Sequence, residues 1–77
     1  MERISLYDYI EHKTGESVEK IKSEDAERCQ VIVTEALRDL VVMNRVAGTG
    51  YLVQIPGEIL ANKECARLAT EIHHEIC

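Results

Sequence analysis

The sequence predicts an α+β domain that is mostly helical, with three or four helices and one β-hairpin at about residues 45–55. Apolar residues recur at three-and-four spacing before Asn44 and after Pro56, which is typical of amphipathic helices. Between these segments, two short alternating runs flank the glycine-rich residues 47–50, which is typical of a hairpin. A length of 77 residues allows a single domain, residues 1–77.

The first predicted helix begins at the capping sequence Ser5-Leu6-Tyr7-Asp8 and runs to about Lys13. Gly15 follows, and glycine readily adopts the left-handed conformation that ends helices. Ser17 then caps a short helical turn, because its hydroxyl can accept a hydrogen bond from a free backbone N–H.

The longest predicted helix begins at Ser23 and ends at Asn44, a residue that tolerates the left-handed conformation. Its expected core face consists of Ala26, Cys29, Val33, Ala36, Leu37, Leu40 and Met43. Four further apolar residues lie outside that face, namely Val31, Ile32, Val41 and Val42. A helix that is apolar on more than one side packs against a second surface. Because so short a chain buries only a modest core, we expect it to form a homodimer.

The predicted hairpin pairs Arg45-Val46 with residues 51–55, and Pro56 then precedes the last helix. The apolar face of that helix consists of Ala61, Cys65, Leu68, Ala69, Ile72 and Ile76.

Residues 33–53 resemble the recognition helix and wing of GntR-type winged-helix domains. The resemblance rests on Val33-Thr34-Glu35-Ala36-Leu37-Arg38-Asp39-Leu40, Asn44, Val46 and Gly48-Thr49-Gly50-Tyr51-Leu52-Val53. It implies a winged-helix-like arrangement and a sequence-specific DNA-binding repressor. The DNA-contacting residues that it implies are Gln30, Thr34, Arg38, Arg45, Gly48, Gly50 and Tyr51.

Two departures weaken the DNA-binding interpretation. Val31 and Ile32 stand where the family has polar residues, and apolar side chains cannot hydrogen-bond base edges or phosphates. The formal net charge is −5, whereas a nucleic-acid binder usually carries an excess of basic residues. We therefore favour a small regulatory protein, such as an inhibitor or adaptor of the kind that phages and mobile elements encode, which binds a protein partner. The residues expected at that interface are Glu16, Glu19, Val31, Ile32 and Val42.

The sequence contains no combination of residues that predicts catalysis, a cofactor or a metal. His73 and Cys77 have i, i+4 spacing on the predicted last helix, but two ligands do not complete a tetrahedral metal site. Cys29 and Cys65 lie on apolar faces, where a buried thiol usually acts as a small hydrophobic group. We therefore expect no catalytic activity.

No apolar run is long enough to span a membrane, and no signal peptide is recognisable. Three cysteines without metal-like spacing fit a reducing compartment. These features favour a cytoplasmic location.

Overall fold

Over the described residues, the backbone combines helices with three short strands, so the α+β, mostly helical class is confirmed. The computed structural model describes residues 2–47 and 51–76. Its elements are, in chain order, β1 (Glu2–Ser5), α1 (Leu6–Thr14), α2 (Val18–Glu24), α3 (Ala26–Ala47), β2 (Tyr51–Ile55), the 3₁₀-helix η1 (Ile59–Ala61), α4 (Lys63–Ala69) and β3 (His74–Ile76).

The three strands form one parallel sheet in the order β1-β2-β3. In this register, Val53 of β2 lies between Ile4 of β1 and His74 of β3. The predicted hairpin at 45–55 is therefore wrong. The strand over residues 51–55 does form, but its partners are β1 and β3, neither of which is its neighbour in sequence. The tip at Gly48 and Gly50 lies outside the described residues.

The first half of the predicted hairpin remains helical because nothing ends α3 at Asn44. Gly15 is the one described residue with a positive φ, so Asn44 does not adopt the left-handed conformation expected of it. Arg45 and Val46 belong to the last turn of α3, which ends at Ala47. The Arg45 guanidinium also pairs with Glu71, and this contact helps to hold the last turn against the segment after α4.

The predicted last helix is also interrupted. Its helical part is confirmed only to Ala69, and β3 begins at His74. The Val53 N–H donates a 2.9 Å hydrogen bond to the His73 carbonyl, so pairing with β2 draws this segment into the sheet. Tertiary pairing has overridden a local helical pattern, as commonly happens where intrinsic preferences differ by less than about 1 kcal/mol per residue.

In the first half of the chain, the helix ends agree more closely with those predicted from the sequence. Gly15 ends α1 with a φ of 78°, and the Ser17 hydroxyl caps α2 by accepting a hydrogen bond from the Lys20 N–H. Ser23, however, lies inside α2 rather than at the start of the longest helix. An Asp25 carboxylate oxygen instead accepts a 3.1 Å hydrogen bond from the Arg28 N–H at the start of α3.

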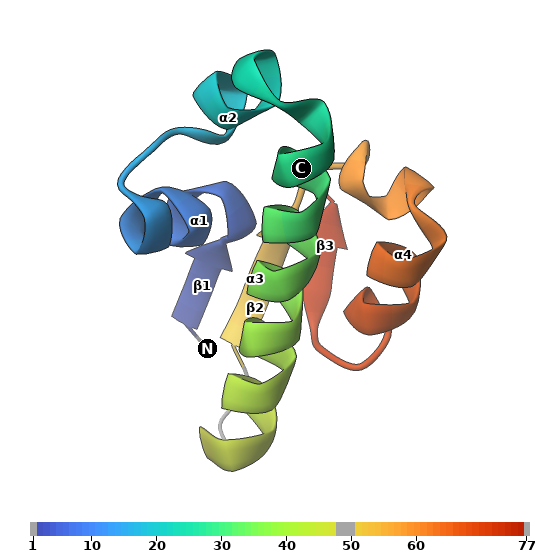
Figure 1. The fold of residues 1–77 in the computed structure, drawn as a ribbon. Coiled ribbons are helices and arrows are strands. Elements are labelled where there is room, and N and C mark those ends of the chain that lie inside the picture. Colours follow the sequence, from blue (N-terminus) through green and yellow to red (C-terminus); the bar gives the residue numbers. More distant parts are fainter. Residues whose placement is uncertain (1, 48–50, 77) are drawn as a thin grey trace.

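Helices α3 and α4 lie over the same face of the sheet (Figure 1). Val53 and Ile55 point to that face and are buried with the inner sides of the helices. The opposite face of the sheet carries mostly polar side chains. By alternation along the strands, its described members are Arg3, Ser5, Leu52, Gln54 and Glu75.

The core face predicted for the longest helix is largely confirmed. Its buried members on α3 are Cys29, Val33, Ala36, Leu37 and Leu40. Ala26 and Met43 are exposed instead, whereas Val41, expected outside the core, is buried. Ile32 is half-buried against the core.

Candidate functional site

Valine side chains point to solvent along the outer side of α3. Val31 and Val42 are each 56% exposed and Val46 is 82% exposed. Single exposed apolar residues are common on proteins and need no explanation. These three instead share one side of one helix, because eleven and four residues are close to whole numbers of helical turns. They are therefore a candidate binding surface.

Two charged residues lie between Val31 and Val42 on the same side of the helix. Val31, Glu35, Arg38 and Val42 follow one another at spacings of four, three and four residues, and all four are exposed. This spacing is that of a coiled-coil seam. We call Val31, Glu35, Arg38, Val42 and Val46 the outer stripe.

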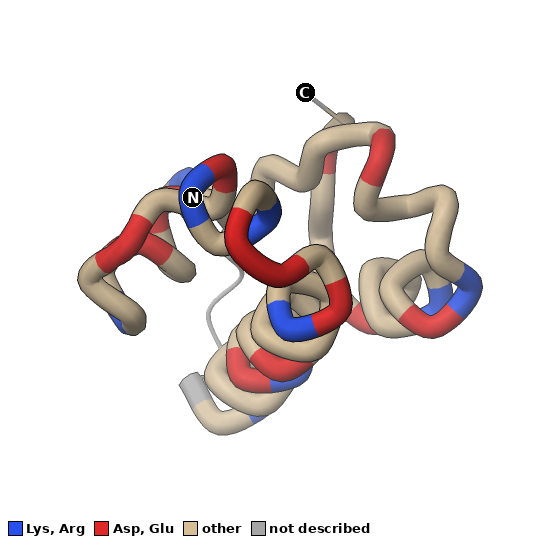
Figure 2. The backbone as a smooth tube through the Cα atoms, turned by 45° about the horizontal axis from the view of Figure 1, so that its top comes forward, with Lys and Arg blue, Asp and Glu red and all other residues tan. Residues whose placement is uncertain are grey.

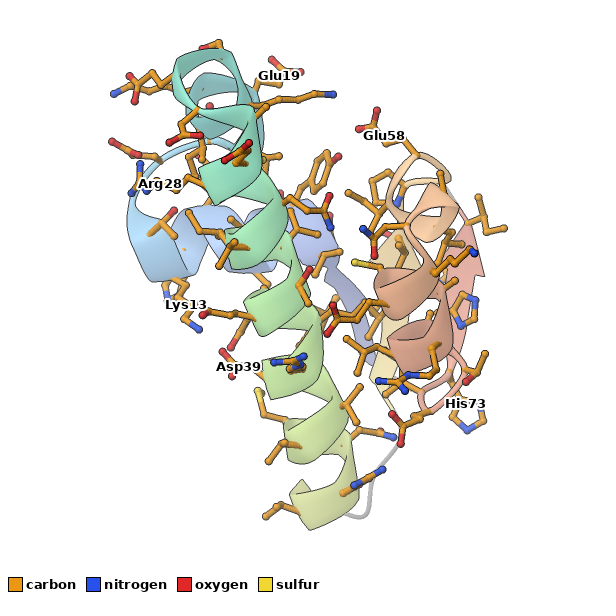
Figure 3. The ribbon with its side chains drawn as sticks, turned by 45° about the vertical axis from the view of Figure 1, so that its right-hand side comes forward. Lys13, Glu19, Arg28, Asp39, Glu58 and His73 are labelled. Atoms are coloured by element: carbon orange, nitrogen blue, oxygen red, sulfur yellow. The ribbon has the colours of Figure 1, made fainter. Side chains whose placement is uncertain are left out.

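Neighbouring elements hold both edges of the outer stripe. On one edge, Lys13 of α1 pairs with Asp39, and the Tyr9 hydroxyl also donates to that carboxylate at 3.4 Å. On the other edge, Arg38 pairs with Glu64 of α4 and Arg45 with Glu71. Figure 3 shows α3 in the foreground between α1 and α4, so its outer side faces away from both.

Three residues expected to contact DNA do come together. Gln30, Thr34 and Arg38 line a groove of about 280 Å³ between α3 and the start of α4. Gln30 Nε2 donates to Thr34 Oγ1 at 3.3 Å, and both side chains also approach the Cys65 sulfur. The amide nitrogen of Gln30 and the hydroxyl of Thr34 therefore already have partners within the fold.

The same groove is partly acidic. Glu35 and Glu64 line it, and Glu64 neutralises Arg38. Figure 2 shows acidic and basic residues mixed along α3, with acidic residues gathered where α2 joins it. Of the remaining residues expected to contact DNA, Arg45 lies farther along α3 and is paired with Glu71. Tyr51 is the first residue of β2, while Gly48 and Gly50 lie outside the described residues.

The residues expected to bind a protein fall into separate regions. Val31 and Val42 are on the outer stripe, whereas Ile32 is half-buried beside it. Glu16 and Glu19 lie at the α1–α2 corner, where Glu16 pairs with Lys20 at 3.8 Å. The structure therefore separates the apolar residues from the acidic ones.

Glu35 and Val46 belong to the outer stripe but were missed in the sequence. The sequence pattern assigned Val46 to a hairpin strand and gave Glu35 no binding role. The sequence spacing nevertheless indicates Val46, because residues four apart, such as Val42 and Val46, lie on the same side of a helix. Recognising it required knowing that α3 continues beyond Asn44.

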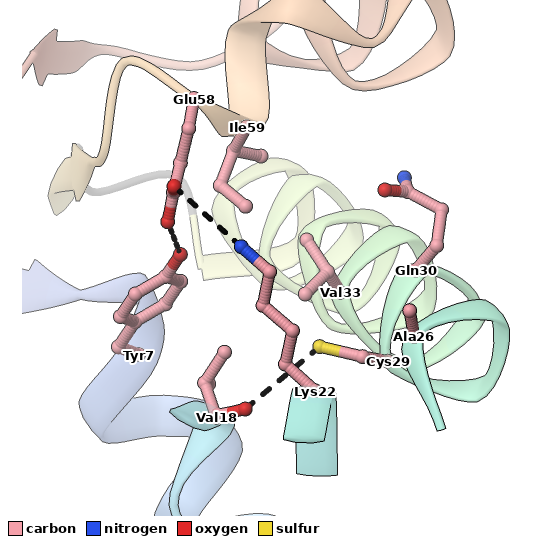
Figure 4. Close-up of a pocket in the computed structure, with 9 residues that line it drawn as sticks. All are labelled: Tyr7, Val18, Lys22, Ala26, Cys29, Gln30, Val33, Glu58 and Ile59. Atoms are coloured by element: carbon pink, nitrogen blue, oxygen red, sulfur yellow. Dashed lines mark hydrogen bonds and ion pairs between the residues drawn. The ribbon is translucent and has the colours of Figure 1, made fainter. Parts of the chain in front are cut away.

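A second pocket, of about 230 Å³, lies at the carboxyl ends of β1 and β2 (Figure 4). There the Tyr7 hydroxyl donates a 2.5 Å hydrogen bond to Glu58 Oε1, and Lys22 approaches Glu58 Oε2 at 3.9 Å. Burial, together with the bond to Glu58, raises the pKa of Tyr7 well above its ordinary value. A tyrosine held in its neutral form does not act as a base near neutral pH.

Cys29 also lines this pocket, but its thiol is not activated. Its sulfur lies 4.0 Å from the Val18 carbonyl oxygen, and burial raises the pKa of the thiol. A reactive cysteine needs a lowered pKa and access to solvent. The pocket therefore contains polar groups that satisfy one another, rather than a nucleophile and its base.

The predicted helical spacing of His73 and Cys77 does not occur. Residue 73 lies between α4 and β3, and Cys77 is outside the described residues. Among residues 2–47 and 51–76, no three His, Cys, Asp or Glu side chains cluster closely enough to hold a metal ion. Within the same ranges, no helix has both the length and the apolar character needed to cross a membrane.

No known protein family, curated protein or solved structure matches this chain. The functional argument therefore rests on its own residues.

Proposed function

We propose that this chain is a small non-catalytic regulatory protein that acts by binding another protein through the outer stripe of α3. The observation that carries the proposal is the alignment of Val31, Val42 and Val46, each more than half exposed, on one side of the longest helix. Covering a valine side chain contributes about 1.5–3 kcal/mol when burial is complete. Val31 and Val42 are 56% exposed and Val46 is 82% exposed, so each can contribute a large part of that free energy to a contact.

The role that fits such a surface is that of an inhibitor or adaptor. The proposed contact needs no chemistry from the chain, because a helix face can be recognised by complementary shape and apolar burial alone. The acidic residues Glu16 and Glu19 lie at a different corner. We assign them a secondary part, in which they attract a basic region of the partner and raise the association rate.

The test is capture of partner proteins from a lysate of the source cell. We expect proteins retained by the wild type to be lost with the double variant Val31→Asp/Val42→Asp, because each aspartate would be buried without a partner. The matched control, Ser23→Asp/Thr70→Asp, adds the same charge at two exposed positions outside the outer stripe. Equal retention by all three proteins, with each shown to be folded by circular dichroism, contradicts the proposal.

A sequence-specific DNA-binding repressor is the second candidate. It is supported by the resemblance of residues 33–53 to GntR-type winged-helix domains and by the shared groove of Gln30, Thr34 and Arg38. Binding to the promoter of its own gene should then weaken steeply with salt, since each neutralised phosphate releases counterions. Loss of that binding in Arg38→Ala and Arg45→Ala would favour this candidate over the first.

A further inference from the structure

Four residues of the outer stripe, from Val31 to Val42, have a self-complementary order. Read in one direction, the seam is Val31, Glu35, Arg38 and Val42. Read in the opposite direction, it is valine, arginine, glutamate and valine. Suppose that the α3 helices of two copies lie antiparallel and that the two-fold axis passes them between residues 36 and 37. Val31 then lies opposite Val42 of the second copy, and Glu35 lies opposite its Arg38.

We propose that a second copy of this chain occupies the outer stripe, in a two-fold symmetric dimer whose α3 helices pack antiparallel. This inference rests on the proposed function, since it names one partner of the same surface. In a two-fold interface every contact occurs twice, so the pairing gives two valine–valine contacts and two Glu35–Arg38 ion pairs. A parallel arrangement would oppose like charges at both positions.

The flanking charge pattern agrees with this arrangement. In the antiparallel pair, Arg45 of one copy lies opposite a position one residue away from Glu27 of the second copy. At 100° of rotation per residue, positions 27 and 45 lie on the same edge of the seam. Arg38 already pairs with Glu64, but its side chain remains 58% exposed and a guanidinium has five N–H donors. It can therefore bridge Glu64 of its own chain and Glu35 of the second copy.

The size of α3 sets the strength of this dimer. A helix of 22 residues is about 33 Å long, and the seam occupies its middle. Two such faces bury less than about 1,200 Å² in total, which is typical of weak and reversible association. The dimer should therefore appear over the micromolar to millimolar range.

Sedimentation equilibrium tests the pairing at protein concentrations from about 10 µM to about 1 mM. This range covers the dissociation constants expected of a weak dimer. We expect a monomer–dimer equilibrium for the wild type and a loss of at least about tenfold in association for Glu35→Arg and for Arg38→Glu, because each places like charges together. An equimolar mixture of the two variants should restore association. Each chain then offers the charge that the other lacks, at both ion pairs.

Controls separate this pairing from general charge effects. Glu11→Arg and Arg3→Glu make the same charge changes at exposed sites on α1 and β1, and both should leave the wild-type equilibrium unchanged. The double swap Glu35→Arg/Arg38→Glu should dimerise like the wild type. A wild type that is monomeric at about 1 mM overturns the inference, as does association of both single variants that is as strong as that of the wild type. If that monomeric wild type still captures proteins that Val31→Asp/Val42→Asp loses, the proposed function stands without the dimer.

Cross-linking tests the antiparallel sense. In a Cys77→Ser background, Val31→Cys and Val42→Cys chains should form a disulfide with each other under mild oxidation, whereas neither should cross-link alone. Cys29 and Cys65 are buried and should not interfere. Cross-linking of Val31→Cys with itself would show a parallel arrangement and contradict the proposed dimer.

Discussion

The two sides of α3 carry the same kind of residue in opposite surroundings. Val33 on the inner side is 2% exposed, whereas Val31 and Val42 on the outer side are each 56% exposed. The inner side is accounted for by the fold, because it packs against the sheet and the other helices. The outer side contributes little to the fold, and the contact with another molecule that we propose would account for its exposed valines.

The uncovered face of the sheet sharpens this comparison. That face is also turned away from the helices, yet it carries Arg3, Ser5, Gln54 and Glu75 around a single leucine. Gln54 Nε2 donates a 2.8 Å hydrogen bond to Glu75 Oε1, so the face is suited to water. The uncovered face of the sheet is therefore mostly polar. The outer stripe differs from it because three of its five residues are exposed valines.

The largest expected effect is a difference in the free energy of unfolding between substitutions on the inner and outer sides of α3. Leu37→Ala should lower the free energy of unfolding by about 2–5 kcal/mol, because Leu37 is fully buried and its loss leaves a cavity. Val42→Ala should change it by no more than about 0.5 kcal/mol. Urea unfolding at a protein concentration low enough to keep the chain monomeric measures both. Similar losses for the two variants would show that the outer stripe is part of the core.

Thiol labelling gives a second difference between the two sides. In a Cys77→Ser background, Cys29 and Cys65 should react only through transient opening, since both are buried and burial raises the pKa of Cys29. A cysteine introduced by Val42→Cys should react at least about a hundredfold faster, which corresponds to an opening free energy of about 2.7 kcal/mol. Mass spectrometry of a timed labelling reaction would resolve the three sites. Equal rates would contradict the burial of the inner side.

Alkaline pH should lower the stability of the fold through Tyr7 of α1. Its pKa is higher in the folded chain than in the unfolded chain, so the folded state keeps this proton above pH about 10 while the unfolded state releases it. The free energy of unfolding should therefore fall as the pH rises above about 10, and Tyr7 should contribute no pH dependence below that value. Tyr7→Phe removes this contribution. A difference between wild type and Tyr7→Phe that does not change with alkaline pH would refute the assignment.

The smallest effect concerns the ion pair at the edge of the outer stripe. Arg38 and Glu64 are 58% and 44% exposed, so solvent screens their attraction. A double-mutant cycle with Arg38→Ala and Glu64→Ala should give a coupling of less than about 1 kcal/mol in the monomer. A much larger coupling would mean that Arg38 is committed to its own chain and is unsuited to a partner.

Local chemistry predicted some elements of this fold well. Gly15 adopts its φ of 78° because glycine has no Cβ to oppose the left-handed conformation. Ser17 caps α2 because its hydroxyl accepts a hydrogen bond from a backbone N–H three residues later. The buried face of α3 follows from helical periodicity. These features depend on neighbours within four residues, which the sequence displays directly.

The features that were missed depend on distant segments. Four residues at β1 and three at β3 are too short to show a strand pattern, and only pairing with β2 makes them strands. The contact between the last turn of α3 and the segment after α4, made by Arg45 and Glu71, likewise joins residues that are far apart in sequence. The candidate site was therefore found in part, through Val31 and Val42, but not as a continuous stripe.

The most direct test of the outer stripe is a dilution series followed by amide NMR. Between about 10 µM and about 1 mM, we expect concentration-dependent shifts along the exposed side of α3 from Glu27 to Val46. Amides of β1, β2 and β3 should not move. Unchanged shifts on the outer stripe, or shifts concentrated on the sheet, would contradict the assignment of this surface to self-association.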